Sequence, residues 1–75
     1  MKRLLEALAR ELVEDPRRVS VYEEVEDGVT YLSLRVAPND RGRVIGRSGR
    51  TADALRAVVS AVASRHGIDC EVDVE

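Results

Sequence analysis

The hydrophobic pattern at the start of the chain predicts an amphipathic helix. Between Lys2 and Asp15 the apolar side chains recur at helical spacing and share one stripe. They are Leu4, Leu5, Leu8, Leu12 and Val13. Asp15 precedes Pro16, and a residue before proline is driven out of the helical region of backbone space. The pattern therefore predicts a helix over residues 2–15 with one apolar face.

Two segments that alternate between apolar and polar residues predict a β-hairpin. Val19–Val25 and Val29–Val36 flank Asp27–Gly28, a dipeptide typical of a two-residue hairpin turn. The predicted partners are Glu26 with Val29, Val25 with Thr30, Glu23 with Leu32, Val21 with Leu34 and Val19 with Val36. Most apolar residues then share one face, as a half-buried sheet requires. Glu23 is the misfit, and we expect it near an edge.

The opposite face of the hairpin is polar apart from two tyrosines. It carries Ser20, Tyr22, Glu24, Tyr31, Ser33 and Arg35. Aromatic rings on an exposed sheet can stack nucleic-acid bases, but the acid on this face opposes an approaching phosphate. We expect this face to meet solvent or another protein.

The middle of the chain predicts a short helix and a loop. Pro38 closes the second strand, and Asn39 or Asp40 can cap a helix that runs to about Ile45. The sequence Gly46-Arg47-Ser48-Gly49 then interrupts the helical pattern.

The last third predicts a longer helix and a strand. The helix spans about Arg50–His66, and Gly67 is its stop signal. Strict alternation over Ile68–Glu75 predicts a strand. Its inward residues are Ile68, Cys70, Val72 and Val74.

The predicted order is helix, strand, strand, helix, helix, strand. Such an order favours a two-layer α+β domain, with a three-stranded sheet on one side and three helices on the other. The connection before the last strand is long enough to cross over the sheet, which allows a mixed sheet. A chain of 75 residues makes one domain, residues 1–75.

Charge is distributed unevenly along the chain. The formal net charge is −2, yet the window Asp40–Arg50 holds four arginines against one acid. That window carries +3 and the remainder of the chain carries −5. A compact basic patch can attract phosphate locally, because solvent screens charges beyond roughly 8–10 Å. An ordinary solvated charge cluster is the alternative.

Composition excludes several classes of function. No apolar run approaches the ~20 residues of a membrane span, and Glu6 comes too early for a signal-peptide core. With Cys70 as its single cysteine, the chain has no internal disulfide, and we expect a cytoplasmic protein. No set of Cys and His residues can hold zinc, so neither a metal nor another cofactor is expected.

Enzymatic motifs are also missing. Gly42–Ser48 superficially resembles a phosphate-binding P-loop, but its glycines stand one residue too close and arginine replaces the lysine. His66, the single histidine, falls at a predicted helix C-terminus, where its positive form suits the helix dipole. No nucleophile, base and orienting group come together in the sequence, so we expect no catalysis.

The segment Val44-Ile45-Gly46-Arg47-Ser48-Gly49-Arg50 resembles the signature of KH domains, in which two aliphatic residues precede a G-x-x-G loop between two helices. The order of elements resembles the type II form, and the likeness covers the whole chain. It is closest to the small stand-alone bacterial KH proteins of the KhpA family. The later run Arg56–Ala63 is also similar to that family's second helix.

The loop has a physical rationale apart from the resemblance. Glycine at both ends permits a sharp turn and the close approach of another backbone. The loop opens a helix whose free N–H groups attract anions, and Arg47 and Arg50 add positive charge. KH domains hold about four nucleotides in this way. A plain connection between two helices is the alternative for Gly46 and Gly49.

The resemblance also implies a groove beside the loop. Val44, Ile45, Ala52 and Leu55 would form its apolar floor, with Arg41 and Arg43 on its rim. A place in the core is favoured over direct base contact for Val44, Ile45 and Leu55, and plain surface charge is the alternative for the two arginines. Ala52 stands where KH domains often have a larger aliphatic residue, which puts the base preference in doubt.

The second long helix offers a surface for pairing. From Ala57 to Ser64 it carries no charge, and one stripe of Leu55, Val58, Val59 and Val62 would suffice to cover the sheet. The neighbouring small residues Ala54, Ala57 and Ala61 are then free to contact a second chain. Alternatively, Leu8 and Leu12 of the first helix cover this strip.

The sequence thus predicts an RNA-binding protein that acts as a post-transcriptional regulator or RNA chaperone with a partner. The resemblance implies single-stranded RNA as ligand, and either a homodimer or a heterodimer with a larger Jag-type KH protein. The main alternative is a protein-interaction module that kept the fold without strong RNA binding.

Overall fold

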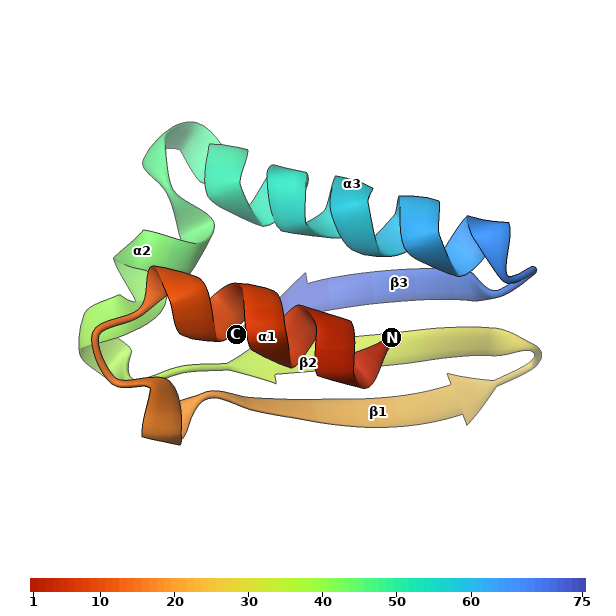
Figure 1. The fold of residues 1–75 in the computed structure, drawn as a ribbon, viewed down its shortest axis with the longest axis horizontal. Coiled ribbons are helices and arrows are strands. Elements are labelled where there is room, and N and C mark those ends of the chain that lie inside the picture. Colours follow the sequence, from red (N-terminus) through yellow and green to blue (C-terminus); the bar gives the residue numbers. More distant parts are fainter.

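The computed structural model describes residues 1–75 and has the predicted order of helices and strands (Figure 1). The regular elements are α1 (Lys2–Leu12), β1 (Ser20–Glu26), β2 (Val29–Arg35), α2 (Arg41–Ile45), α3 (Arg50–Arg65) and β3 (Asp69–Val74). Three short 3₁₀ turns join them: η1 (Pro16–Arg18), η2 (Pro38–Asp40) and η3 (Arg47–Gly49). The predicted α+β class is confirmed.

The sheet has the strand order β1-β2-β3 and is mixed. β1 and β2 pair antiparallel, and the predicted register from Glu26↔Val29 to Val21↔Leu34 is confirmed. The turn residues Asp27 (φ 51°) and Gly28 (φ 79°) both have positive φ, as a type I′ hairpin requires. β3 pairs with β2 in parallel, because α2 and α3 carry the chain back across the sheet.

All three helices cover one face of the sheet, and the core lies between the two layers (Figure 1). Leu5 and Ala9 of α1 and Val59 of α3 are fully buried there. They pack with Val19, Val21, Leu32, Leu34, Val36, Val44 and Leu55. The opposite face of the sheet is bare, and Tyr22 and Tyr31 are exposed on it.

The first helix is shorter than predicted. It ends at Leu12, and Val13 is already extended (φ −99°, ψ 161°). The next two backbone N–H groups, those of Glu14 and Asp15, donate to the carboxylate of Asp40 instead of continuing the helix. That carboxylate makes no hydrogen bond to the start of α2, so the predicted side-chain cap is wrong for Asp40.

Several predicted core positions are less buried than their alternation indicates. Val25 is 65% exposed because the hairpin extends past the start of α1 (Figure 1). Ile68 precedes β3 and is also exposed, while Cys70, Val72 and Val74 are half-buried. On α3 the buried residues are Ala52, Leu55, Val59 and Ala63. Val58 is 45% exposed, so its predicted place over the sheet is wrong.

Candidate nucleic-acid interface

Gly46 ends α2 in a conformation that only glycine adopts readily. Its φ of 76° and ψ of 172° lie outside the regions open to L-residues with a side chain. Its N–H donates to the Gly42 carbonyl at 2.9 Å. A Cβ built on Gly46 would lie 2.3 Å from Thr51 Oγ1 and 2.8 Å from the Thr51 nitrogen. The site therefore excludes a side chain both by backbone conformation and by space.

Ser48 and Gly49 continue the loop in left-handed conformations. Ser48 has φ 57° and ψ 25°, and Gly49 has φ 76° and ψ 11°. The Gly49 N–H donates to the Gly46 carbonyl at 3.1 Å and closes the turn. A Cβ on Gly49 would meet nothing within 4 Å, so conformation alone favours glycine there. The two glycines of the loop are thus needed for different reasons.

The polar side chains of the loop are available to a ligand. Arg47, Ser48 and Arg50 are exposed, and neither arginine forms an ion pair within the chain. Gly49 occupies the N-cap position of the 16-residue α3 and provides no side-chain cap. The first N–H groups of α3 and two free guanidinium groups therefore lie at one end of the molecule, an arrangement that favours an anionic ligand.

The predicted groove residues divide into two groups. Val44, Ala52 and Leu55 are buried, at 0%, 4% and 5% exposure. They support the interface from the core, as the alternative interpretation expected. Ile45, which directly precedes the loop, is 39% exposed and presents apolar surface beside it.

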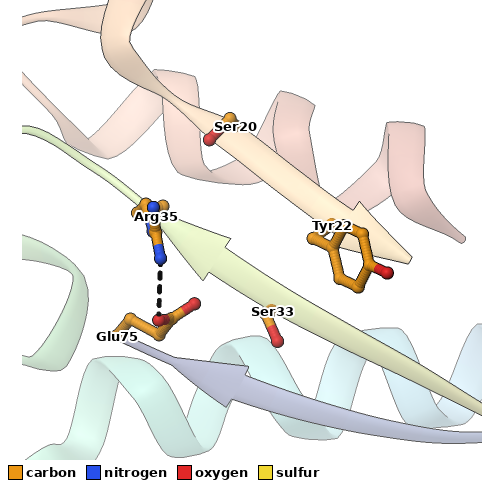
Figure 2. Close-up of a pocket in the computed structure, with 5 residues that line it drawn as sticks. All are labelled: Ser20, Tyr22, Ser33, Arg35 and Glu75. Carbon is orange, nitrogen blue, oxygen red and sulfur yellow. Dashed lines mark hydrogen bonds and ion pairs between the residues drawn. The ribbon is translucent and has the colours of Figure 1, made fainter. Parts of the chain in front are cut away.

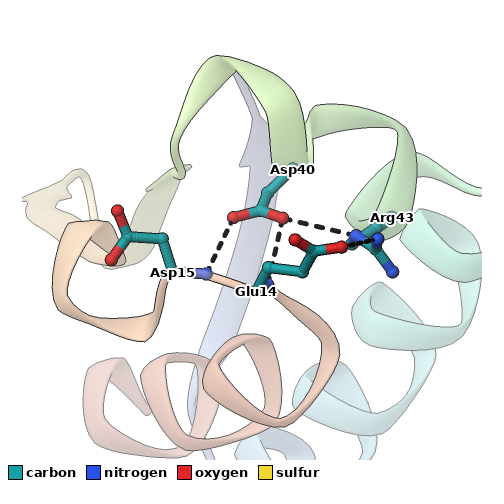
Figure 3. A network of polar contacts seen from close by, with 4 residues as sticks. All are labelled: Glu14, Asp15, Asp40 and Arg43. Atoms are coloured by element: carbon teal, nitrogen blue, oxygen red, sulfur yellow. Dashed lines mark hydrogen bonds and ion pairs between the residues drawn. The ribbon is translucent and has the colours of Figure 1, made fainter.

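The two predicted rim arginines have different surroundings. Arg41 is exposed and makes no ion pair. Arg43 pairs with Glu14, and its Nε lies 3.4 Å from Asp40 Oδ1 (Figure 3). A contact of either arginine with phosphate stays a prediction, but the guanidinium of Arg43 already has two acidic neighbours.

Two residues of this region were not predicted from the sequence. Asp40 is buried between the end of α1 and the start of α2. Arg56 joins α3 to the free edge of β3, since its Nε donates to the Val72 carbonyl at 3.1 Å. Its Nη1 also donates to Asp53 Oδ1 at 3.1 Å. The available signal in the sequence was the i,i+3 spacing of an acid and an arginine, which occurs in Asp40 with Arg43 and in Asp53 with Arg56.

The small-residue strip of α3 is uncovered. Ala54, Ala57 and Ala61 are all exposed, so the alternative in which α1 covers them is wrong. α1 instead lies beside α3 and leaves a shallow apolar groove between the two helices. Its lining consists of Leu8, Glu11, Leu12, Thr51, Ala54, Leu55 and Val58.

The bare sheet face is a poor surface for phosphate. A hollow on it is lined by Ser20, Tyr22, Ser33, Arg35 and Glu75 (Figure 2). Arg35 Nη2 lies 3.3 Å from Glu75 Oε1, so the one basic side chain of the hollow is paired with an acid. The prediction that this face meets solvent or a protein stays untested.

Cys70 lies on the inward side of β3. Burial raises the pKa of its thiol above the ordinary value of 9.0, and the ammonium group of Met1 offsets part of this rise. The thiol is therefore protonated and unreactive near neutral pH.

Comparison with known proteins decides the family. The sequence model of the protein family KhpA/KhpB, KH domain, matches residues 2–74. The chain belongs to this family. KhpA of Clostridium acetobutylicum and of Halalkalibacterium halodurans, both named as RNA-binding proteins, are each 42% identical to it over 74 residues. The match covers 99% of this chain and 99% and 97% of those relatives. KhpA of Clostridium perfringens is 40% identical over 74 residues.

Membership of this family confirms the predicted KH fold and the expectation of a protein that is not an enzyme. No helix in the structure combines the length and the apolar character needed to cross a membrane.

Proposed function

We propose that this chain binds single-stranded RNA and that the loop Gly46-Arg47-Ser48-Gly49 holds the sugar–phosphate backbone. The observation that carries the proposal is the loop conformation, with positive φ at Gly46, Ser48 and Gly49. It turns the chain sharply at the start of α3 and leaves Arg47 and Arg50 unpaired. The RNA-binding names of the bacterial relatives support the ligand class.

The bases would lie beside the loop, against Ile45 and the part of α3 that follows Gly49. Val44, Ala52 and Leu55 support this surface from below. We expect Arg41 to meet a neighbouring phosphate, because it lies in the basic window Asp40–Arg50 and has no acidic partner. Ala52 is small and buried where a larger aliphatic residue would add contact surface, so we expect weak base selectivity.

A cytoplasmic post-transcriptional regulator or RNA chaperone fits these properties. One small domain with about two to four phosphate contacts binds weakly by itself. Its specificity would come from a second RNA-binding module held close by, since linked sites raise the effective concentration.

The uncovered strip of α3 is the surface that we propose for such pairing. Ala54, Ala57 and Ala61 let another helix approach closely, and exposed Val58 extends the apolar area. The partner would be a second copy of this chain or a larger Jag-type KH protein. Either pairing would place two loops on one particle.

The deciding experiment replaces Arg47 and Ser48 by Asp. Both side chains are exposed, and Asp tolerates the left-handed conformation of Ser48, so the fold should be retained. We expect RNA binding in a fluorescence anisotropy titration to be lost, with an unchanged circular dichroism spectrum. Wild-type affinity in this variant would remove the proposal and favour a protein-interaction module.

A further inference from the structure

Asp40 is the one buried charged residue of the chain, with 2% exposure. Its carboxylate lies between two segments that are distant in sequence. Oδ1 accepts the Glu14 N–H at 3.0 Å, and Oδ2 accepts the Asp15 N–H at 3.1 Å (Figure 3). Burying a carboxylate is costly unless it is hydrogen-bonded, and here both oxygens have backbone donors. Asp40 therefore ties the end of α1 to the start of α2.

Arg43 extends this tie by one turn of α2. Its Nε lies 3.4 Å from Asp40 Oδ1, and its Nη2 pairs with the Glu14 carboxylate. The side chains of Glu14 and Arg43 are 74% and 50% exposed, and an exposed ion pair of this kind contributes little to stability by itself. The hydrogen bonds to the buried Asp40 carboxylate are the stronger part of the network.

The side of α2 on which Arg43 lies argues against a role in RNA contact. Residues two positions apart in an α-helix point about 200° apart, so Arg43 and Ile45 lie on opposite sides of α2. Ile45 is exposed beside the loop, while Arg43 reaches Glu14 after α1. Its guanidinium is thus directed toward the α1 connection.

α2 has only five residues, too few to hold their conformation without tertiary contacts. Its last residue is followed at once by Gly46, so the direction of α2 sets the direction of the loop. Val44 fixes one side of α2 in the core, and the Asp40 network fixes its start.

We infer that Asp40 and Arg43 are positioning residues for the RNA-binding loop and do not contact RNA. The inference rests on the proposed function of that loop. It replaces the predicted role of Arg43 on the groove rim and leaves that role to Arg41.

The test compares Asp40→Asn, Arg43→Gln and Arg41→Gln. Asp69→Asn, the same substitution at an exposed acid, is the control for Asp40→Asn. The probe is a short fluorescein-labelled RNA of mixed sequence, titrated at several salt concentrations. The amide resonances of Gly46 and Gly49 in ¹H–¹⁵N NMR spectra report the loop conformation without RNA. Circular dichroism establishes that each variant is folded.

For Asp40→Asn we expect shifted Gly46 and Gly49 amides and about fivefold weaker RNA binding, because one of the two hydrogen bonds that hold the start of α2 is lost. Arg43→Gln should weaken binding without changing the slope of log affinity against log salt. Arg41→Gln should make that slope shallower by about 0.7, the value for one single-strand phosphate contact. Asp69→Asn should match the wild type in every measurement.

A slope in Arg43→Gln that is shallower than the wild-type slope by about 0.7, with unmoved loop amides, would overturn the inference by making Arg43 a phosphate contact. Wild-type binding and unmoved amides in a folded Asp40→Asn variant would also overturn it. If Asp40→Asn does not fold, the salt slope of Arg43→Gln decides. RNA binding that survives Arg47→Asp/Ser48→Asp removes the proposed function instead, while the amide shifts still test the positioning.

Discussion

Two short turns of this protein use the same unusual backbone conformation for different purposes. In the hairpin, Asp27 and Gly28 have φ values of 51° and 79°. In the loop between α2 and α3, Ser48 and Gly49 have φ values of 57° and 76°. Each turn places two successive residues in the left-handed region. The first joins the antiparallel strands β1 and β2, and the second joins α2 to α3.

The surroundings of the two turns differ in packing and charge. A Cβ on Gly28 would meet nothing within 4 Å, whereas a Cβ on Gly46 would collide with Thr51. The hairpin turn follows Glu26 and contains an acid, while the loop carries Arg47 and leads into a long helix. In the hairpin, the left-handed backbone serves only to connect two strands. In the loop, the same conformation occurs together with close packing, the start of a helix and positive charge, and this combination makes a candidate site.

Alanine at Gly46 and at Gly28 should separate these roles most strongly. Gly46→Ala forces a side chain into a glycine-only conformation and against Thr51, and should cost roughly 2–4 kcal/mol of stability and abolish RNA binding. Gly28→Ala meets no neighbour and should cost about 1–2 kcal/mol, with RNA binding retained. Thermal melting and anisotropy titrations measure both. Equal losses of binding would mean that the loop is no more specialised than the hairpin turn.

Charge removal should distinguish the loop from other basic surface. Arg50→Gln should make the slope of log RNA affinity against log salt shallower by about 0.7. The control is Arg65→Gln, which removes an exposed arginine from the opposite end of α3 and should leave the slope unchanged. An unchanged slope for Arg50→Gln would show that its guanidinium does not touch the RNA backbone.

Pairing through α3 would place two loops on one particle without changing how each loop binds RNA. Ala61→Glu places a charge in the uncovered strip and should give a folded monomer with several-fold weaker RNA binding, since avidity is lost. Sedimentation of wild type and variant at micromolar concentrations tests this. A wild-type chain that stays monomeric excludes the homodimer and leaves the Jag-type partner.

Asparagine should relieve the left-handed residue of the loop that is neither glycine nor an Asn or Asp. Asn tolerates positive φ better than serine, so Ser48→Asn should stabilise the fold by roughly 0.5 kcal/mol, whereas Asp27→Asn exchanges two tolerant residues and should change stability little. Ser48→Asn should also keep its RNA affinity, which melting and titration of the same sample can show. A marked loss of affinity would make the Ser48 hydroxyl itself a contact.

The order of elements, the hairpin register and the place of the loop all follow from the amino-acid sequence alone. These depend on local rules: alternation places Val21 and Leu34 on one face, Asp27–Gly28 fixes a two-residue turn, and glycine marks each end of the loop. The family signature fell in the same segment, and the match over residues 2–74 agrees with it.

Which side chains of the loop region are free depends on contacts between segments that are distant in sequence. The sequence suggested that Asp40 caps its own helix. Its carboxylate instead accepts the N–H groups of Glu14 and Asp15, which lie 26 and 25 residues earlier in the chain. Arg41 and Arg43 are indistinguishable in the sequence, but in the structure only Arg43 lies beside Glu14 and pairs with it. The exposure of Val58 depended likewise on how far α1 lies from α3. Contacts between distant segments set these outcomes, and no local pattern encodes the distance between two packed elements.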